Sequence, residues 1–404
     1  MRDSGFHRPD PIRVGGDNAF ATDTMAVRVP GIIREVQSMN ADYPDAILRR
    51  LDRLHAALTG NEPIQMLELL PAPGPDYEDW QAAYREQRRK IDPLTWQNCE
   101  WFFAETFLYR HLIQAVRWAE TGRDPFAQKK REELESARFL KLLNAALEVD
   151  GTFAEKLPVL LSFCLWGNRV DLSHPAGDIA ADALNEDEFL VDDREALRRY
   201  VTTGTGERGA GERIVHIIAD NAGTELAMDL ILADLLLAGG CCKAVVFHVK
   251  PFPTYVSDAT VADVWNVIRA MENSGDSPAH LAARLRCAWD DERLRIATHY
   301  FWTSSRFLWE MPSTLSRLFR VASLVILKGD MNYRRAVGDA LWDVQPAFST
   351  VMQYFPAPVV ALRSLKSDAV VGLSAELVRR LDQNNAQWRV GGHYGVIQFA
   401  TSTR

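Results

Sequence analysis

The spacing of apolar residues changes about halfway along the 404-residue chain. From residue 41 to about residue 200, apolar residues recur at intervals of three and four, which places them on one face of a helix. The clearest such segments are 45–58, 78–91, 98–118 and 131–147. Because no convincing strand pattern interrupts these segments, we expect this half of the chain to be helical.

The second half alternates short apolar runs with helical segments. The apolar runs are 213–219, 243–249, 295–301, 322–328, 358–363 and 395–400. Continuous apolar strands separated by helices are typical of parallel sheets that are buried on both faces. We therefore predict an α/β fold in which helices sandwich a largely parallel sheet. This is a Rossmann-like α/β/α arrangement, and an all-helical domain precedes it.

The length of the chain favours two domains or one large domain with a helical annex. The first 30 residues are rich in Pro, Gly and Asp and lack clean periodicity, so we expect an arm or tail at 1–30. A helical domain is then predicted at 31–205 and an α/β catalytic domain at 206–404. Glycines near this boundary have a G-x-G-x-x-G spacing, but they precede a strand instead of following one. A linker is therefore favoured over a dinucleotide site.

Composition restricts the partners that we expect. Hydrophobic residues make up 47% and charged residues 25%, which is typical of a globular protein. The net charge of −8 argues against nonspecific binding to nucleic acid, because phosphate neutralisation requires a basic surface. The longest apolar run, 157–166, is about half a membrane span. We therefore expect neither a nucleic acid nor a membrane as partner.

The cysteines favour a cytoplasmic protein. Their number is odd, and they show no CxxC spacing, which indicates reduced thiols. The N-terminal residues carry charges but no apolar segment of the kind that a secretory signal needs. The five positions are Cys99, Cys164, Cys241, Cys242 and Cys287.

Three oxygen donors follow the first two predicted strands. One strand runs into Asp220 and Asn221, and the next leads through a proline-containing loop to Asp258. Ligands of open parallel sheets bind beyond the carboxyl ends of the strands, where neighbouring strands would bring these donors together. Two carboxylates and a carboxamide suit Mg²⁺ or Mn²⁺. The alternative interpretation of Asp220-Asn221 is an ordinary helix cap, while His216 and His248 lie inside strands and favour core roles.

Cations follow two later strands. Lys328, Asp330 and Arg334 crowd one strand-to-helix turn, and Arg363 and Lys366 follow the next strand. Either turn alone is typical of surface charge. Beside a hard-metal site, cations and amide donors instead indicate a phosphate clamp and phosphoryl chemistry. Whether an aspartate attacks phosphorus or only positions the metal and a water stays open.

Two polar clusters in the helical half have less specific interpretations. The segment KKREE at 129–133 carries both signs on an amphipathic helix, so we expect a solvated face. Glu105, Tyr109 and Arg110 share one helical face, where a core polar network and a substrate contact are equally consistent with the spacing.

Several long strings resemble the DUF89 family, in particular its ARMT1-like sugar-phosphate damage-control phosphatases. The similarity extends over nearly the whole chain after about residue 25 and includes WFFAETFLYR in the helical half. The strings that carry it are, in chain order, LWGNRVDLS, ADNAGTELAMDL, VVFHVKPFPTYVSD, KGDMNYRR and LRSLKSDAVVGL.

This resemblance implies metal-dependent hydrolysis of small phosphorylated sugars such as fructose 1-phosphate and fructose 6-phosphate, with Mn²⁺, Mg²⁺, Co²⁺ or Ni²⁺ as cofactor. It implies that Asp220, Asn221 and Asp258 bind the metal, and that Asp220, Asp258 and Lys366 are catalytic. The implied substrate contacts are Asn168, Asp330, Met331, Asn332, Tyr333, Arg334, Arg363 and Lys366. Serine replaces threonine in the family's Arg-Thr-x-Lys signature at residue 364, so the hydroxyl is kept.

Two other function classes remain possible from the sequence. Members of the family are also linked to S-adenosylmethionine-dependent methylation of protein carboxyl groups. A glycine-rich turn after the first strand would favour that activity, but only Gly223 is present there. A noncatalytic sugar-phosphate sensor is the third class, and an intact metal set with a lysine argues against it. The sequence does not indicate an oligomeric state.

Overall fold

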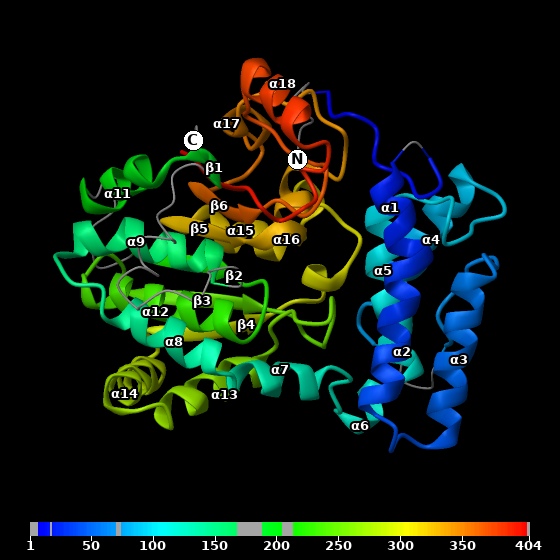
Figure 1. Ribbon diagram of the computed structural model, residues 1–404, viewed down its shortest axis with the longest axis horizontal. Helices are drawn as coiled ribbons and strands as arrows, with labels where there is room; N and C mark the ends of the chain where they lie inside the picture. The colour runs from blue at the N-terminus through cyan, green and yellow to red at the C-terminus, as the bar shows by residue number, and fades with distance from the viewer. Residues whose placement is uncertain (1–6, 17, 70–73, 168–187, 204–212, 402–404) are drawn as a thin grey trace.

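The computed structural model describes residues 7–16, 18–69, 74–167, 188–203 and 213–401. Figure 1 shows a group of N-terminal helices standing beside a larger part built on a sheet. The helices of the first group are α1 (Ala19–Asp23), the π-helical turn η1 (Thr24–Arg28), α2 (Val29–Met39), α3 (Asp45–Thr59), α4 (Tyr77–Lys90), α5 (Trp101–Ala115) and α6 (Trp118–Thr121).

The segment predicted to be an arm is helical from Ala19 onward. The Asn18 side chain caps α1 by accepting a hydrogen bond from the backbone N–H of Ala21 at 2.8 Å. Ala21, Met25 and Val29 are buried at intervals of four residues, so they form one apolar stripe along α1, η1 and α2. This stripe packs into the core of the N-terminal helices.

The sheet confirms the predicted α/β class. Its strand order is β1-β7-β6-β5-β2-β3-β4, and every neighbouring pair is parallel except β6 and β7. The strands are β1 (Phe189–Asp192), β2 (Ile214–Ile218), β3 (Ala244–Val249), β4 (Leu294–Thr298), β5 (Leu324–Lys328), β6 (Val359–Ser364) and β7 (Gly395–Ala400). The edge strand β1 was not predicted, because four half-exposed residues carry too little apolar pattern.

Alternate residues of the strands face two different apolar cores. In β2, Val215 and Ile217 belong to one core, whereas Ile218 belongs to the other. The first core is completed by α8 (Ala137–Leu147), α9 (Phe153–Trp166), α12 (Thr224–Ala238), α13 (Val261–Glu272) and α14 (Asp276–Asp290). The second is completed by α15 (Ser313–Arg320), α16 (Gly329–Val337), α17 (Phe348–Val351) and α18 (Ala375–Asn384).

The two apolar cores favour a division between the two parts that lies before residue 205, where the sequence analysis placed it. Residues 12–126 supply the core of the N-terminal helices, whereas α9 packs on the sheet, α8 packs on α12 and α14, and α11 (Arg194–Thr203) packs on α9. Helix α7 (Ala127–Leu134) runs between the two parts (Figure 1). We therefore propose a boundary near residue 126. The difference arises because a helix that covers a sheet shows the same amphipathic period as one in a bundle. The glycines at 204–209 lie outside the described residues.

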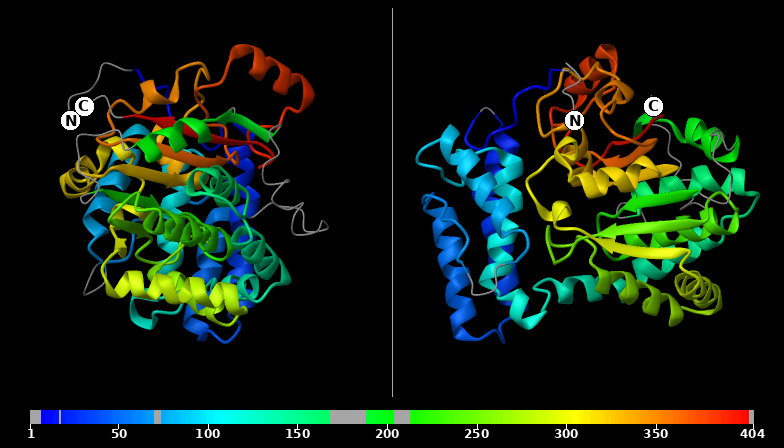
Figure 2. Two further views of the ribbon diagram at one scale, coloured as in Figure 1. Left: turned by 90° about the vertical axis from the view of Figure 1, so that its left-hand side faces the viewer. Right: turned by 180° about the vertical axis from the view of Figure 1, so that it is seen from behind.

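The strand order reverses next to β2. The chain passes from β2 to β3 and β4 on one side, and then returns to β5 and β6 on the other. A crevice forms at such a reversal, outside the carboxyl ends of the strands. The ends of β2, β3, β5 and β6 carry the predicted functional residues, so the fold places them at one edge of the sheet. Figure 2 shows the two parts of the molecule from two further directions.

In the described part of the chain, no helix has both the length and the apolar character needed to cross a membrane. All five cysteines are free thiols, and Cys99, Cys164 and Cys242 are buried. Burial raises the pKa of the Cys242 thiol to about 12, so this side chain stays protonated and packs as a small apolar residue.

Candidate active site

Backbone hydrogen bonds join the two segments that carry the predicted metal ligands. The N–H of Ala259 donates to the carbonyl of Asp220 at 2.8 Å, and the N–H of Ala222 donates to the carbonyl of Ser257 at 2.6 Å. Asn221 and Asp258 thereby form an isolated antiparallel bridge. The structure thus brings Asp220, Asn221 and Asp258 together, although they come from two different strand ends.

Side-chain hydrogen bonds connect Asn221 to a second acid that the sequence analysis missed. The Asn221 amide donates to Asp220 Oδ2 at 3.0 Å and to Glu225 Oε2 at 2.8 Å. Ser257 Oγ donates to Asn221 Oδ1 at 2.6 Å. Glu225 lies four residues after Asn221 in the first turn of α12, a spacing that could have indicated it.

Burial and the neighbouring negative charges disfavour the ionised forms of the two aspartates in this cluster. Burial raises the pKa of Asp220 well above its usual value, and the charges of Glu225 and Asp258 raise it further, while Lys250 and Lys366 oppose them. Burial likewise raises the pKa of Asp258 to about 6, against the effect of the neighbouring Lys250. A cation at this position would relieve the repulsion between the carboxylates.

The residues present fit a hard divalent cation. Asp258 Oδ2 and Lys250 Nζ form a buried ion pair at 3.3 Å, yet neither atom has a hydrogen-bond partner among the described residues. No group of three His, Cys, Asp or Glu side chains suited to a metal occurs in the described ranges, so the candidate set depends on the Asn221 amide. Two carboxylates and one amide leave the remaining positions of Mg²⁺ or Mn²⁺ to water and substrate oxygens.

The turn after β5 closes against Asp220. Gly329 has a φ of +79°, and a Cβ atom there would lie 1.9 Å from Asp220 Oδ2. Next to it, Lys328 is fully buried, and its ammonium pairs with Glu225 at 2.9 Å and with Asp229 at 2.8 Å. Lys328 therefore positions Glu225 and is not a free cation for phosphate.

The loop after β6 is held by Asp330. Its Oδ1 accepts hydrogen bonds from Arg363 Nε at 2.7 Å, the Lys366 N–H at 3.1 Å and Ser367 Oγ at 3.0 Å. Although burial raises the pKa of Asp330, the Arg363 guanidinium lowers it below its usual value. Arg363 is fully buried and also donates to the carbonyls of Ser367 and Ala369. The exposed Lys366 is the cation that this loop directs toward Asp220.

The other predicted substrate contacts on α16 are buried with protein partners. Asn332 donates to the carbonyls of Ile218, Ala219 and Lys328, although its buried Oδ1 has no hydrogen-bond partner in the described part of the chain. The remaining contacts are Tyr333 with Gln398 and Val371, and Met331 with Arg335. Substrate binding by these side chains stays a prediction. Asn168 lies outside the described residues.

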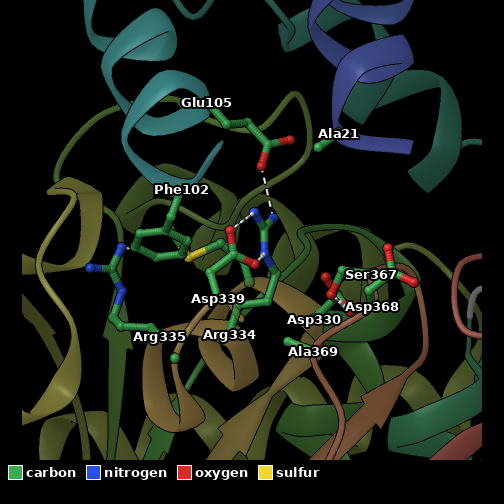
Figure 3. A network of polar contacts seen from close by, with 12 residues as sticks. Ala21, Phe102, Glu105, Asp330, Arg334, Arg335, Asp339, Ser367, Asp368 and Ala369 are labelled. Atoms are coloured by element: carbon green, nitrogen blue, oxygen red, sulfur yellow. Dashed lines mark hydrogen bonds and ion pairs between the residues drawn. The ribbon is translucent and has the colours of Figure 1, made fainter. Parts of the chain in front are cut away.

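Arg334 connects the two parts of the molecule, as Figure 3 shows. Its guanidinium pairs with Glu105 of α5 at 2.8 Å and with Asp339 at 2.8 Å, and it lies over the ring of Trp101. Of the residues that share the face of α5, Glu105 thus belongs to a polar network, and Arg110 pairs with Asp76 at 2.6 Å.

An open cavity of about 520 Å³ adjoins the candidate metal ligands. Asn221, Ser257 and Lys366 line it from the sheet, and Arg28 lines it from the N-terminal helices. This volume is within the range of small-molecule sites. Arg28 was not predicted as a site residue, because the segment 1–30 was predicted to be an arm or tail. The further lining residues are Val27, Gly31, Ile32, Glu35, Lys129, Lys130, Glu133, Tyr255 and Val256.

The two strand histidines lie in the core, apart from the acids. His216 Nδ1 and His248 Nε2 are 2.9 Å apart, and both side chains are buried. Burial lowers the pKa of His216 to about 4 and that of His248 to about 3. Both rings pack against Phe319, so they support the sheet, as their positions inside strands indicated.

The fold and the site define an α/β protein with an acidic, metal-compatible centre at a strand-order reversal. The model of the damage-control phosphatase ARMT1-like domain family matches residues 24–381. The chain belongs to this family, and the membership supports a phosphatase of the metabolite damage-control class. The DUF89 resemblance is confirmed.

Relatives of this chain carry the same family name. The Danio rerio damage-control phosphatase ARMT1 is 27% identical over 100% of both chains. The Xenopus tropicalis protein of that name is 30% identical over 81% of both chains. Among solved structures, a DUF89 family protein from Pyrococcus horikoshii matches 97% of this chain and 99% of its own, with a TM-score of 0.52 and 15% identity. That likeness concerns the fold alone.

Proposed function

We propose that the protein hydrolyses phosphate monoesters of small sugars, such as fructose 1-phosphate and fructose 6-phosphate, with a divalent cation as cofactor. The observation that carries this proposal is the cluster of the buried Asp220 and Asp258 with the half-buried Asn221, beside a cavity lined by Asn221 and Lys366. The candidate cations are Mn²⁺, Mg²⁺, Co²⁺ and Ni²⁺. The five free cysteines support the expectation that the protein acts in the cytoplasm.

In this proposal, Asp220, Asn221 and Asp258 hold the cation. When bound, a divalent cation polarises the phosphoryl oxygens and lowers the pKa of a coordinated water. Lys366 neutralises charge on the phosphate, and Asp330 holds the Lys366 loop at the correct position through the Lys366 N–H. Arg363 and Arg334 act indirectly, because their guanidinium groups are engaged by the protein.

The test is phosphate release from a panel of sugar phosphates with each of the four cations. We expect metal-dependent release by the wild type and none by Asp220→Ala. Lys366→Met is expected to lower kcat/KM by about 100-fold, since removing one preorganised charge-stabilising group typically has that effect. Asp234→Ala is the matched control, because Asp234 lies on α12, the helix that follows Asp220, and forms a surface pair with Arg284.

Full metal-dependent turnover by Asp220→Ala would contradict the proposed centre. Turnover that persists unchanged in a chelator would contradict the role of the cation. If no ester in the panel is hydrolysed by the wild type, the sugar-phosphate substrate class is wrong.

A further inference from the structure

Helix α7 contains a buried cation that faces the candidate metal centre. Lys130 is 7% exposed, and its ammonium donates to Asp124 Oδ2 at 2.9 Å, to the Asp258 carbonyl at 3.1 Å and to Asp263 Oδ2 at 2.8 Å. An ammonium has three donors, so this one is saturated. Asp263 also accepts hydrogen bonds from the N–H and the hydroxyl of Thr260 at the start of α13. Lys130 thus links α7 to both ends of the segment 258–263, through the Asp258 carbonyl and the Asp263 carboxylate.

A carboxylate one turn later on α7 contacts the other ligand segment. Glu133 Oε1 accepts a hydrogen bond from the Thr224 N–H at 2.8 Å, at the start of α12. A negative charge is favourable at a helix N-terminus. The chain at Gly223 has a φ of +67°, and a Cβ there would lie 2.3 Å from the Glu133 carboxyl carbon. Glu133 therefore packs directly against the turn that follows Asp220 and Asn221.

Two cavities adjoin α7 where it meets the ligand segments. Lys130 lines both the cavity of about 520 Å³ and a second cavity of about 920 Å³, and Ala222 and Gly223 line the second. Backbone hydrogen bonds join the two segments to each other, and Ala222 and Ala259 are packed in the core. The polar contacts of Lys130 and Glu133 add an anchor from α7 to this packing.

We propose that Lys130 and Glu133 are positioning residues that anchor the two joined metal-ligand segments to α7. This role rests on the proposed function, because it requires a cation at Asp220, Asn221 and Asp258. Partners that orient metal ligands typically contribute 10- to 100-fold to metal affinity. The segment 129–133 is therefore more than the solvated face that its mixed charges predicted.

The test is a Mn²⁺ titration of the full-length protein, in which free Mn²⁺ is followed by its electron paramagnetic resonance signal. We expect Lys130→Met and Glu133→Gln to weaken Mn²⁺ binding by about 10- to 100-fold, with kcat at saturating Mn²⁺ within a few-fold of the wild type. Lys130→Arg keeps the charge and is expected to restore most of the affinity. The matched control is Glu132→Gln, since Glu132 neighbours Glu133 on α7 but is exposed, and this variant is expected to bind Mn²⁺ like the wild type.

Glu133→Gln keeps the role of α7 testable if Lys130→Met does not fold, because Glu133 is partly exposed. Wild-type Mn²⁺ affinity in both Lys130→Met and Glu133→Gln, with Asp258→Asn unable to bind, would overturn the positioning role while leaving the metal centre intact. Absence of Mn²⁺ binding by the wild type would instead remove the metal centre and the proposed function with it.

Discussion

Two groups of polar side chains stand at the same edge of the sheet, and they differ in how completely the protein satisfies them. After β2 and β3, the buried atoms Asp258 Oδ2 and Lys250 Nζ have no hydrogen-bond partner among the described residues. After β5 and β6, Asp330, Arg334 and Arg363 each contact several protein groups.

From this difference we infer that the group after β2 and β3 binds the ligand, whereas the group after β5 and β6 mainly supports the fold. Buried polar groups are normally hydrogen-bonded, so a buried ion pair that lacks other hydrogen bonds, next in sequence to the cavity-lining Ser257, indicates a place for an external ligand. A guanidinium that already donates to carboxylates and carbonyls of the protein fixes the backbone and has few donors left for a ligand. Only the exposed Lys366 extends from the second group into the cavity. We therefore expect variants of the first group to lose metal and turnover, and most variants of the second group to lose stability.

The largest expected effect is on stability, in Arg334→Met. This change leaves Glu105 and Asp339 buried without their cation, and such a loss typically costs about 3–5 kcal/mol. Urea unfolding measures it, with Arg198→Met as control. Arg198 forms an exposed pair with Glu195, so the control should leave the free energy of unfolding close to the wild-type value. A variant of wild-type stability that has lost turnover would show that Arg334 contacts the substrate directly.

A smaller but more specific effect is expected in Gly329→Ala. Both Gly329 and Gly240 have positive φ values, so alanine strains the backbone at either position. Only at Gly329 would the new methyl group displace Asp220 as well, whereas a Cβ at Gly240 would meet no atom within 4 Å among the described residues beyond its chain neighbours. We expect phosphate release to fall about 100-fold in Gly329→Ala, as for a ligand misplaced by about 1 Å, and to stay near the wild-type value in Gly240→Ala. Equal activity in the two variants would contradict the close contact with Asp220.

The smallest expected effect is a pH dependence of stability that arises from the core histidines. The folded state lowers the pKa of His216 to about 4 and that of His248 to about 3, from an ordinary value near 6.5. The unfolded chain therefore binds more protons below about pH 6.5. Their contribution is fully present above that pH and is lost as the pH falls toward 4 for His216 and toward 3 for His248, by on the order of 2 kcal/mol for each histidine at pH 5.

Urea unfolding at pH 7 and pH 5 measures this loss. His248→Gln should reduce the difference between the two pH values, whereas replacement of the exposed His280 by Gln should leave it unchanged. Buried carboxylates with raised pKa values act in the opposite direction, so the comparison between variants isolates the histidines. An unchanged pH dependence in His248→Gln would contradict the neutral buried pair.

The apolar pattern was enough to predict the sheet, because buried parallel strands must be continuously apolar. It placed β2, β3 and β5 nearly to the residue. It failed where the signal is short or ambiguous. Strand β1 has four partly exposed residues, and the cap at Asn18 that starts α1 lies in a segment whose Pro and Gly content resembles an arm.

The partners of the charged side chains could not be predicted, because they lie far apart in the sequence. Lys328 pairs with Glu225, and Arg334 pairs with Glu105, which is 229 residues away. Sequence spacing therefore indicated that cations follow β5 and β6 but not that most of them are already engaged. Likewise, the mixed charges of 129–133 gave no sign that Lys130 is buried against the Asp258 segment.

The central claim is that β2 and β3 supply the metal centre, whereas β5 supplies support. The most direct test compares Mn²⁺ binding by Asp258→Asn and Asp330→Asn in calorimetric titrations of the two folded proteins. We predict that Asp258→Asn loses Mn²⁺ binding and that Asp330→Asn binds Mn²⁺ with the wild-type affinity, because Asp330 is engaged by Arg363 and by the Lys366 loop. Wild-type binding by Asp258→Asn, or loss of binding by Asp330→Asn alone, would contradict this assignment.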